Sequence, residues 1–211
     1  CEGRPWMEII RRANAGREDL VVVGMRNLHG RRGANVGSVA MKLLRKCPVP
    51  VWVVHPRQEL GHHCIVAATE LGPVGALAVE YGAYVARESN CDFHVVHAYQ
   101  IPFQLQMSSS HMTGEEYEEK IAELADSARK AAEKQLADAG GEGRVHVGWN
   151  SPSHMILEAA EQLDASLLVM GTLTAPGPAG LLLGSTAEHL LTRLDCSLLG
   201  IKPEGFVSPV Q

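Results

Sequence analysis

Apolar runs and amphipathic segments alternate along the whole chain. Runs typical of buried strands occur at residues 20–23, 51–54, 64–68, 93–98, 144–149, 167–170 and 198–201. Between them, apolar residues recur at the spacing of one helix face, which predicts helices that start near Pro5, Ser38, Pro73, Thr113, Pro152 and Thr186. From His62 onward the order is therefore β-α-β-α-β-α-β-α-β, whereas only α-β-α-β precedes Pro56.

This alternation predicts an α/β fold of the Rossmann-like kind, in which helices sandwich an open, largely parallel five-stranded sheet. We divide the chain into a C-terminal half-domain at 1–56, a linker at 57–61, a complete domain at 62–203 and a tail at 204–211. Sheets of this kind bind ligands at the carboxyl ends of their strands. The functional site is therefore expected at that edge.

Local signals place the ends of the longest predicted helix. Thr113 and Glu116 have the spacing of a capping box, and Gly140 with Gly141 ends the helical pattern. The preceding connection, 99–112, is polar and irregular, so we expect it to form no helix or strand and to be mobile.

A unit of strand, glycine loop and helix occurs twice. In the later copy, the apolar strand 167–170 ends at Gly171, and a loop rich in Gly and Pro leads to Gly184 and Ser185 at the start of a helix that reaches Leu194. The earlier copy has matching residues at Gly24, Gly37 and Ser38. Free N–H groups at a helix start favour a phosphate or carboxylate, although a serine there is also a common structural cap. The later copy therefore predicts an anion site.

Composition excludes several classes of function. With 19 Lys and Arg against 24 Asp and Glu, the net charge of −5 provides no basic surface for nucleic acid. No apolar run approaches the roughly 20 residues of a membrane helix, and the first residues do not resemble a signal peptide. The five cysteines lack CxxC spacing, which favours buried thiols over disulfides or a zinc site. We expect a cytoplasmic protein that binds neither nucleic acid nor membrane.

With this order of strand, glycine loop and helix, the chain resembles the universal stress protein family in its tandem two-domain form. Nucleotide-binding members of that family carry the motif G-x2-G-x9-G-[S/T] after the fourth strand. The motif positions here are Gly171, Thr174, Gly184 and Ser185 in the later copy, and Gly24, Asn27, Gly37 and Ser38 in the earlier copy. The second glycine is replaced in both copies, which makes the motif degenerate.

The resemblance also implies where the rest of a nucleotide would lie. Family members place an aspartate at the end of the first strand, on the ribose and adenine side, where this chain has Thr69, and the backbone contact from the second strand would fall at Ala98. If the second glycine needs a left-handed backbone, Thr174 costs about 1–2 kcal/mol. The lost charged hydrogen bond at Thr69 costs about 1.5–3 kcal/mol. We therefore expect ATP to bind weakly, with an affinity lower by roughly two to three powers of ten.

The resulting hypothesis assigns six residues to a small-ligand site: Gly171, Gly184, Ser185 and Thr186 for phosphate-like groups, and Thr69 and Ala98 for the base or apolar part. We expect a non-enzymatic binding and signalling module of the stress response, with a small anionic ligand or nucleotide as its partner. One alternative is an ATP-binding regulatory switch that uses the glycine loop of the second domain. The other is a slow nucleotide hydrolase, which the lack of a magnesium carboxylate at Thr69 disfavours.

The sequence predicts no catalytic or metal site. It contains no G-x-S-x-G motif. His94 and His97 face opposite sides of a strand, and the adjacent His62 and His63 also diverge, so neither pair is ready to bind a metal. We interpret the histidines as isolated polar or partly buried residues.

The resemblance further implies contacts between the domains. The last strand of each unit, 51–54 and 198–201, is expected to pair with the other as an intramolecular pseudo-dimer, and a homodimer of the whole chain is a further expectation. The first domain lacks its N-terminal half in this chain. We therefore expect residues outside the chain to cover the edge of strand 20–23 and the apolar faces of helices 5–15 and 38–46.

Overall fold

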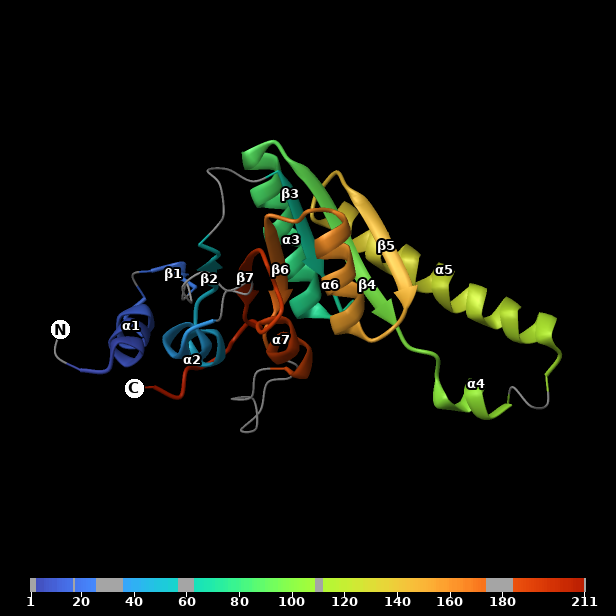
Figure 1. The fold of residues 1–211 in the computed structure, drawn as a ribbon, viewed down its shortest axis with the longest axis horizontal. Coiled ribbons are helices and arrows are strands. Elements are labelled where there is room, and N and C mark those ends of the chain that lie inside the picture. Colours follow the sequence, from blue (N-terminus) through green and yellow to red (C-terminus); the bar gives the residue numbers. More distant parts are fainter. Residues whose placement is uncertain are drawn as a thin grey trace.

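The computed structural model describes residues 3–16, 18–25, 36–56, 63–108, 112–173 and 184–210 (Figure 1). Its helices are α1 (Pro5–Asn14), α2 (Ser38–Lys46), α3 (Pro73–Ser89), α4 (Phe103–Ser108), α5 (Gly114–Asp138), α6 (Pro152–Gln162) and α7 (Ser185–Leu190). Its strands are β1 (Val21–Gly24), β2 (Val51–Val54), β3 (Cys64–Ala68), β4 (Asp92–Tyr99), β5 (Arg144–Trp149), β6 (Leu167–Gly171) and β7 (Ser197–Ile201).

All these strands belong to one seven-stranded sheet in the order β1-β2-β7-β6-β3-β4-β5. Neighbours from β7 to β5 pair in parallel, as do β1 and β2. The predicted α/β fold with a largely parallel sheet is therefore confirmed. The chain moves outward from β3 through β4 to β5 and then returns to β6 on the other side of β3, so the strand order reverses between β3 and β6.

The two expected final strands, β2 and β7, pair with each other, and they do so antiparallel. Their register joins three residue pairs, Val51–Gly200, Trp52–Leu199 and Val53–Leu198. This single antiparallel ladder connects the strands before residue 56 to those after residue 63 in a continuous sheet. The expected pairing of the final strands is therefore present.

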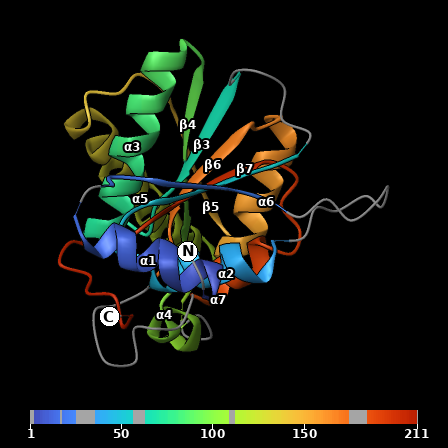
Figure 2. The same ribbon diagram turned by 90° about the vertical axis from the view of Figure 1, so that its left-hand side faces the viewer.

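Helices cover both faces of the sheet (Figure 2). On one face α3 and α5 pack over residues such as Val95 and Val169, and on the other α1, α2, α6 and α7 pack over residues such as Val96 and Leu168. These strand residues alternate along the chain because successive side chains point to opposite faces. No described helix combines the length and the apolar character that a membrane crossing requires.

The apolar faces of α1 and α2 are already covered, so the expectation that residues outside the chain must cover them is wrong. Ile10, Leu43 and Leu44 are fully buried, because the two helices pack against each other and against the sheet. Strand β1 does lie at an edge of the sheet, where Val22 is 61% exposed.

Several helix ends follow their sequence signals. The Thr113 hydroxyl accepts the Glu116 N–H at 3.2 Å, and the Glu116 carboxylate accepts the Thr113 N–H at 2.8 Å, which confirms the capping box at α5. Ser151 accepts the His154 N–H at 3.3 Å at the start of α6. Asn90 ends α3 in the left-handed conformation, with a φ of 50°.

Two expected boundaries are wrong. Residues 103–108 form α4, inside the connection that was expected to hold no helix. This helix starts after Pro102, whose carbonyl accepts the Leu105 N–H at 3.0 Å. Phe103 and Met107 lie one turn apart but are 69% and 63% exposed, so no inward apolar stripe marked the helix. Residues 109–111 lie outside the described part of the chain.

Helix α7 is also shorter than expected, because it ends at Leu190 and not at Leu194. The N–H groups of Arg193 and Leu194 both bond to the Leu190 carbonyl at 2.9 Å, which closes the helix in a turn. With only six residues, α7 provides a weaker positive end than the sequence suggested.

The C-terminal tail returns to α1, as Figure 1 shows from the position of the C-terminus. The Asn14 side-chain amide donates to the Val210 carbonyl at 2.5 Å, and Val210 is buried in the same core as α1 and α2. The tail thus closes one end of this core. Its short sequence has neither a helix nor a strand pattern, so it gave no signal of this packing.

Candidate functional site

A cavity of about 330 Å³ opens at the carboxyl ends of β3, β4 and β6. All six residues assigned to the site from the sequence line it: Thr69, Ala98, Gly171, Gly184, Ser185 and Thr186. Thr69 follows β3, Ala98 lies near the end of β4, Gly171 ends β6, and the other three surround the start of α7. The cavity lies where the strand order reverses, which is the usual ligand position in an open α/β sheet.

Thr69 holds three elements together. Its hydroxyl donates to Gln135 Oε1 at 2.7 Å and accepts the Leu71 N–H at 2.9 Å. Its carbonyl accepts a hydrogen bond from His97 Nδ1 at 2.8 Å, and its N–H donates to the Val96 carbonyl at 3.0 Å. The O–H group of Thr69 therefore already donates to Gln135 of α5. The sequence gave no sign of Gln135, which lies far from Thr69 along the chain.

Ala98 forms the neighbouring part of the cavity wall. The last pair between β3 and β4 is Ala68 with Val96, so Ala98 extends beyond the end of β3. On its other side Ala98 pairs with Gly148 of β5. The small side chain leaves this end of the cavity open.

The described ends of the glycine loop, at Gly171 and Gly184, line the opposite wall. The Gly184 N–H donates to the Thr172 carbonyl at 3.1 Å, which holds the start of α7 against the end of β6. A Cβ atom added at Gly171 would lie 2.6 Å from Val74 Cγ1 of α3. Gly171 is therefore required for packing as well as for the cavity. Thr174, which replaces the second motif glycine, lies outside the described residues.

The earlier copy of the unit is only partly described. Gly24 ends β1, Gly37 is the N-cap of α2, and Ser38 is its first residue. Asn27 and the rest of that loop, 26–35, lie outside the described residues. The described candidate site therefore belongs to the later copy.

The cavity lining has little charge. Among the described lining residues, Glu70 and His97 are the titratable ones. Glu70 Oε1 accepts the Gly75 N–H at 3.0 Å, so this carboxylate already binds the first turn of α3. The whole segment 171–187 contains no Lys or Arg in its sequence. A Lys or Arg that contacts an anionic ligand here would therefore come from another part of the chain.

Lys202 is a buried lysine directly behind the cavity lining, and no sequence motif pointed to it. It is 5% exposed, and its Nζ donates to Thr172 Oγ1 at 2.7 Å and to the Leu44 carbonyl. Thr172 itself lines the cavity. Burial lowers the pKa of Lys202 to about 7, while the Cys47 thiol acts in the opposite direction. A lysine that directly follows an apolar strand was the signal that could have identified it.

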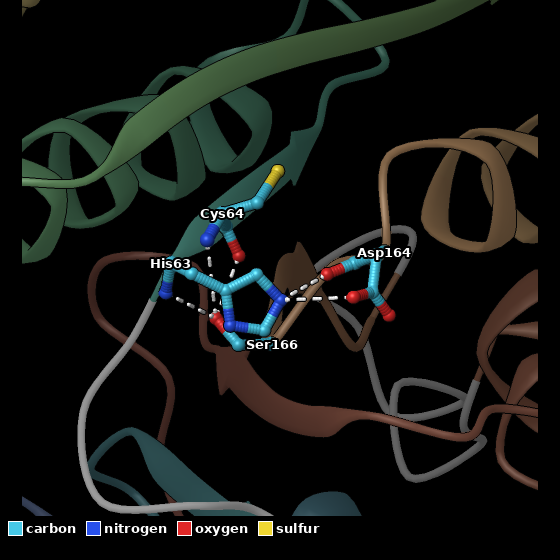
Figure 3. A network of polar contacts seen from close by, with 4 residues as sticks. All are labelled: His63, Cys64, Asp164 and Ser166. Atoms are coloured by element: carbon cyan, nitrogen blue, oxygen red, sulfur yellow. Dashed lines mark hydrogen bonds and ion pairs between the residues drawn. The ribbon is translucent and has the colours of Figure 1, made fainter.

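A polar network lies at the opposite edge of the sheet, where β3 and β6 begin (Figure 3). Ser166 Oγ donates to the Cys64 carbonyl at 2.7 Å and accepts the His63 N–H at 3.3 Å. His63 Nε2 lies 2.5 Å from the Asp164 carbonyl oxygen and 3.5 Å from Asp164 Oδ2. The serine hydroxyl is thus bonded to backbone groups and is not aligned with the imidazole. These four residues join two strands and do not form a nucleophile–base–acid set.

His94 is not isolated, so the expectation is wrong for this residue. Its Nδ1 lies 2.9 Å from His146 Nε2 on the neighbouring strand β5. Burial and the second imidazole lower the pKa of His94, and burial with Arg144 lowers that of His146. Within the ranges that the structure describes, no group of three or more His, Cys, Asp or Glu could hold a metal ion.

The described cysteines are free thiols: Cys47, Cys64, Cys91 and Cys196. Burial raises the pKa of Cys64 to about 11 and that of Cys196 to about 12. Because the thiolate is the reactive form, these side chains stay protonated and unreactive near neutral pH.

The mostly parallel sheet, with helices packed on it and a cavity at its reversal point, defines an α/β protein. A sequence model of the universal stress protein family matches residues 1–55 and again 62–202. The chain therefore belongs to the universal stress protein family.

Relatives and solved structures agree with this assignment. Universal stress protein E of Escherichia coli K12 is 32% identical over 218 residues, which cover 99% of this chain and 68% of that protein. The same protein of Photorhabdus laumondii is 26% identical, with 99% and 69% covered. The crystal structure of a putative universal stress protein from Pseudomonas aeruginosa has a TM-score of 0.73 at 23% identity, with 96% of this chain and 69% of that chain covered. A universal stress protein from Archaeoglobus fulgidus has a TM-score of 0.67 at 22% identity, with 95% and 67% covered.

Proposed function

We propose that this protein is a non-enzymatic binding and signalling module of the stress response, and that its second unit holds a small anionic ligand or nucleotide. The observation that carries the proposal is the cavity at the carboxyl ends of β3, β4 and β6. Its lining includes all six residues that were selected from the glycine motif and its companion positions. They come from three distant parts of the chain, so their meeting is not a result of sequence proximity.

The arrangement of the lining suggests how a ligand lies. The phosphate-like end is placed near Gly171, Gly184 and Ser185, where glycine permits close approach to the backbone. The less polar end is placed beside Ala98 and Ile156, which also line the cavity. This orientation follows the order that the family motif implies.

The bonds of Thr69 support weak nucleotide binding. Its hydroxyl already donates to Gln135 Oε1 at 2.7 Å, so it can donate to a ribose oxygen only after that bond breaks. An aspartate carboxylate at this position would accept ribose hydroxyls without such a loss. We therefore expect a dissociation constant for ATP or ADP near the millimolar range, about −4 kcal/mol of binding free energy.

The absence of enzymatic activity is also part of the proposal. The described titratable groups of the lining are engaged in bonds to the backbone, Glu70 with the Gly75 N–H and His97 with the Thr69 carbonyl. Neither is paired with a described hydroxyl or thiol that it could activate.

Calorimetric titration with ADP tests the site. The wild-type protein is compared with Ala98→Phe, which fills the cavity, and with Ala122→Phe, the same change at an exposed position of α5. We expect saturable binding to the wild-type protein and to Ala122→Phe, and an affinity at least about tenfold lower for Ala98→Phe. Equal binding by all three proteins, or none at millimolar ADP, contradicts the proposal. A micromolar dissociation constant for ATP would favour a regulatory ATP switch, and release of ADP from ATP would favour a hydrolase.

We further infer that residues 1–56 and 62–203 are related units of a tandem cytoplasmic protein that meet as a pseudo-dimer. The two matches to one family, at 1–55 and 62–202, support this inference, as does the antiparallel pairing of β2 with β7. Association of whole chains into a homodimer stays a prediction. Sedimentation analysis tests it against the chain mass of 22.8 kDa.

A further inference from the structure

Lys202 connects the first unit to the wall of the cavity in the second. Its Nζ donates to the Leu44 carbonyl, near the end of α2, and to Thr172 Oγ1 at 2.7 Å. Thr172 lines the cavity, and its own carbonyl accepts the N–H of Gly184, a residue of the glycine loop. One residue, Thr172, thus contacts both the buried amine and the loop that borders the ligand.

Apart from His97, the described cavity lining has no side chain that can carry a positive charge. This lining contains Glu70 but no Lys or Arg, and the sequence 171–187 contains no basic residue. An anion in such a site needs a cation or many donors to replace the water that it loses. Lys202 lies behind the part of the wall that faces the proposed phosphate-like group.

The surroundings of Lys202 favour its neutral form while the cavity has no anion. The groups around the amine come from three parts of the chain. They are the Leu44 carbonyl and the Cys47 thiol from α2 and its following residue, the Thr172 hydroxyl directly after β6, and the Phe206 ring of the tail, whose centroid is 5.4 Å from Nζ. Among the described residues, no carboxylate forms an ion pair with Lys202. A buried ammonium without a counter-charge is unfavourable, and a nearby anion removes that penalty.

We propose that Lys202 is a positioning residue for the negative charge of the ligand, and that it takes up a proton from solvent as the anion binds. This inference rests on the proposed ligand site in the second unit. The pKa near 7 supports it, because both protonation states are then accessible under ordinary conditions. Ligand uptake and proton uptake occur together, so acidification strengthens binding.

A purely structural role for Lys202 makes a different prediction. If the amine only joins α2 to β6 through its two hydrogen bonds, a neutral donor of similar length replaces it, and ligand affinity keeps its dependence on pH. Lys202→Gln is such a neutral donor. Lys120→Gln makes the same change at an exposed position of α5 and is the matched control.

The test is calorimetric titration of ADP into each protein at about pH 6, 7.5 and 9, in two buffers with different ionisation enthalpies. At a given pH, the ionisation of ADP itself is the same in every experiment. A difference in affinity or proton uptake between two proteins therefore comes from their side chains. For the wild-type protein we expect an affinity about tenfold higher than that of Lys202→Gln at pH 6 and a difference that vanishes at pH 9. We also expect uptake of a fraction of a proton at about pH 7.5. Lys120→Gln is expected to behave as the wild-type protein does.

Each outcome distinguishes a ligand-positioning role of Lys202 from a purely structural role. If wild-type protein binds ADP and Lys202→Gln binds it with the same affinity at each pH, the role of Lys202 is wrong while the ligand site stands. If wild-type protein binds no ADP at any pH, both proposals fail. If Lys202→Gln does not fold, as judged by circular dichroism, proton uptake by the wild-type protein on binding decides the question. Zero uptake at about pH 7.5 then overturns the inference.

Discussion

His94 Nδ1 lies 2.9 Å from His146 Nε2, so a hydrogen bond between two imidazoles joins the side chains of β4 and β5. One ring donates its N–H and the other accepts through an unprotonated nitrogen. The bond is therefore lost when both rings are protonated. Burial lowers the pKa of both histidines, and the charges of Arg144 and Arg129 act in the same direction, whereas Asp92 raises that of His94.

We predict that this pair makes the fold sensitive to acid. Because the pKa of each histidine is lower in the folded chain than in the unfolded chain, the unfolded state binds protons first as the pH falls below about 6.5. The contribution to stability is complete above that pH and is lost as the pH falls toward the lower folded values. Urea unfolding of wild-type protein and His146→Gln at pH 7.5, 6.5 and 5.5 measures the effect. The wild-type protein should lose more stability than the variant, and His154→Gln, at an exposed histidine of α6, should lose as much as the wild-type protein.

Lys202 should give a pH dependence of the same sign as the histidine pair, but at higher pH. Its pKa is about 7 in the folded chain and about 10.4 in the unfolded chain, so the unfolded state holds more protons between these values and stability rises with pH. Relative to Lys202→Gln, wild-type protein should gain about 2 kcal/mol in unfolding free energy between pH 7.5 and 9. Using the difference between the two proteins removes the contributions of the buried thiols, which weaken the fold at high pH. Parallel pH profiles for both proteins would show that Lys202 titrates normally.

Removal of the Ser166 hydroxyl should destabilise the sheet without affecting the cavity. Ser166 Oγ bonds to the Cys64 carbonyl and to the N–H groups of His63 and Cys64, which start β3. Ser166→Ala leaves these buried backbone groups with fewer partners, at a cost of about 1–3 kcal/mol. Ser89→Ala, at an exposed position, should change stability by less than about 0.5 kcal/mol. Guanidinium unfolding compares the two, and equal stabilities would show that the network in Figure 3 contributes nothing.

Gly75 lies in α3, but the helix itself does not require a glycine there. The close approach of Thr69 and Glu70, which line the cavity, leaves no room for a Cβ atom. A Cβ atom at this position would lie 2.3 Å from Thr69 Oγ1 and 3.0 Å from the Glu70 nitrogen. Although alanine favours helices more than glycine does, Gly75→Ala should lower stability by about 1–3 kcal/mol because Thr69 must move. Gly114→Ala, at the start of α5 with nothing near its added carbon, should leave stability unchanged or slightly higher. Thermal unfolding of both variants tests this, and a Gly75→Ala protein as stable as wild type would contradict it.

The fold could be predicted from the sequence largely because most strands are continuous apolar runs with clear ends. Strands β2, β3 and β5 have the bounds that the runs indicated, and the Thr113 capping box gave the start of α5. Helix α4 could not be predicted in the same way, because Phe103 and Met107 point largely to solvent and so show no inward stripe.

The same contrast between local sequence patterns and long-range packing applies to the candidate site. Its six residues were found because they belong to motifs that are local in sequence, and parallel strands bring such motifs to one edge. Gln135, His146 and Lys202 were missed because their partners depend on strand register and on packing between distant elements. No periodic pattern in the sequence indicates that Lys202 Nζ donates to the Leu44 carbonyl, which belongs to the other unit.

The antiparallel ladder between β2 and β7 gives the two halves of the sheet opposite polarity. The chain leaves β1 at Gly24 on one rim, whereas it leaves β6 at Gly171 on the other rim. The rim of the sheet around Gly171 therefore carries the ends of β6 and β7 but the beginnings of β1 and β2. A ligand at one glycine unit and a ligand at the other would therefore approach the sheet from opposite rims.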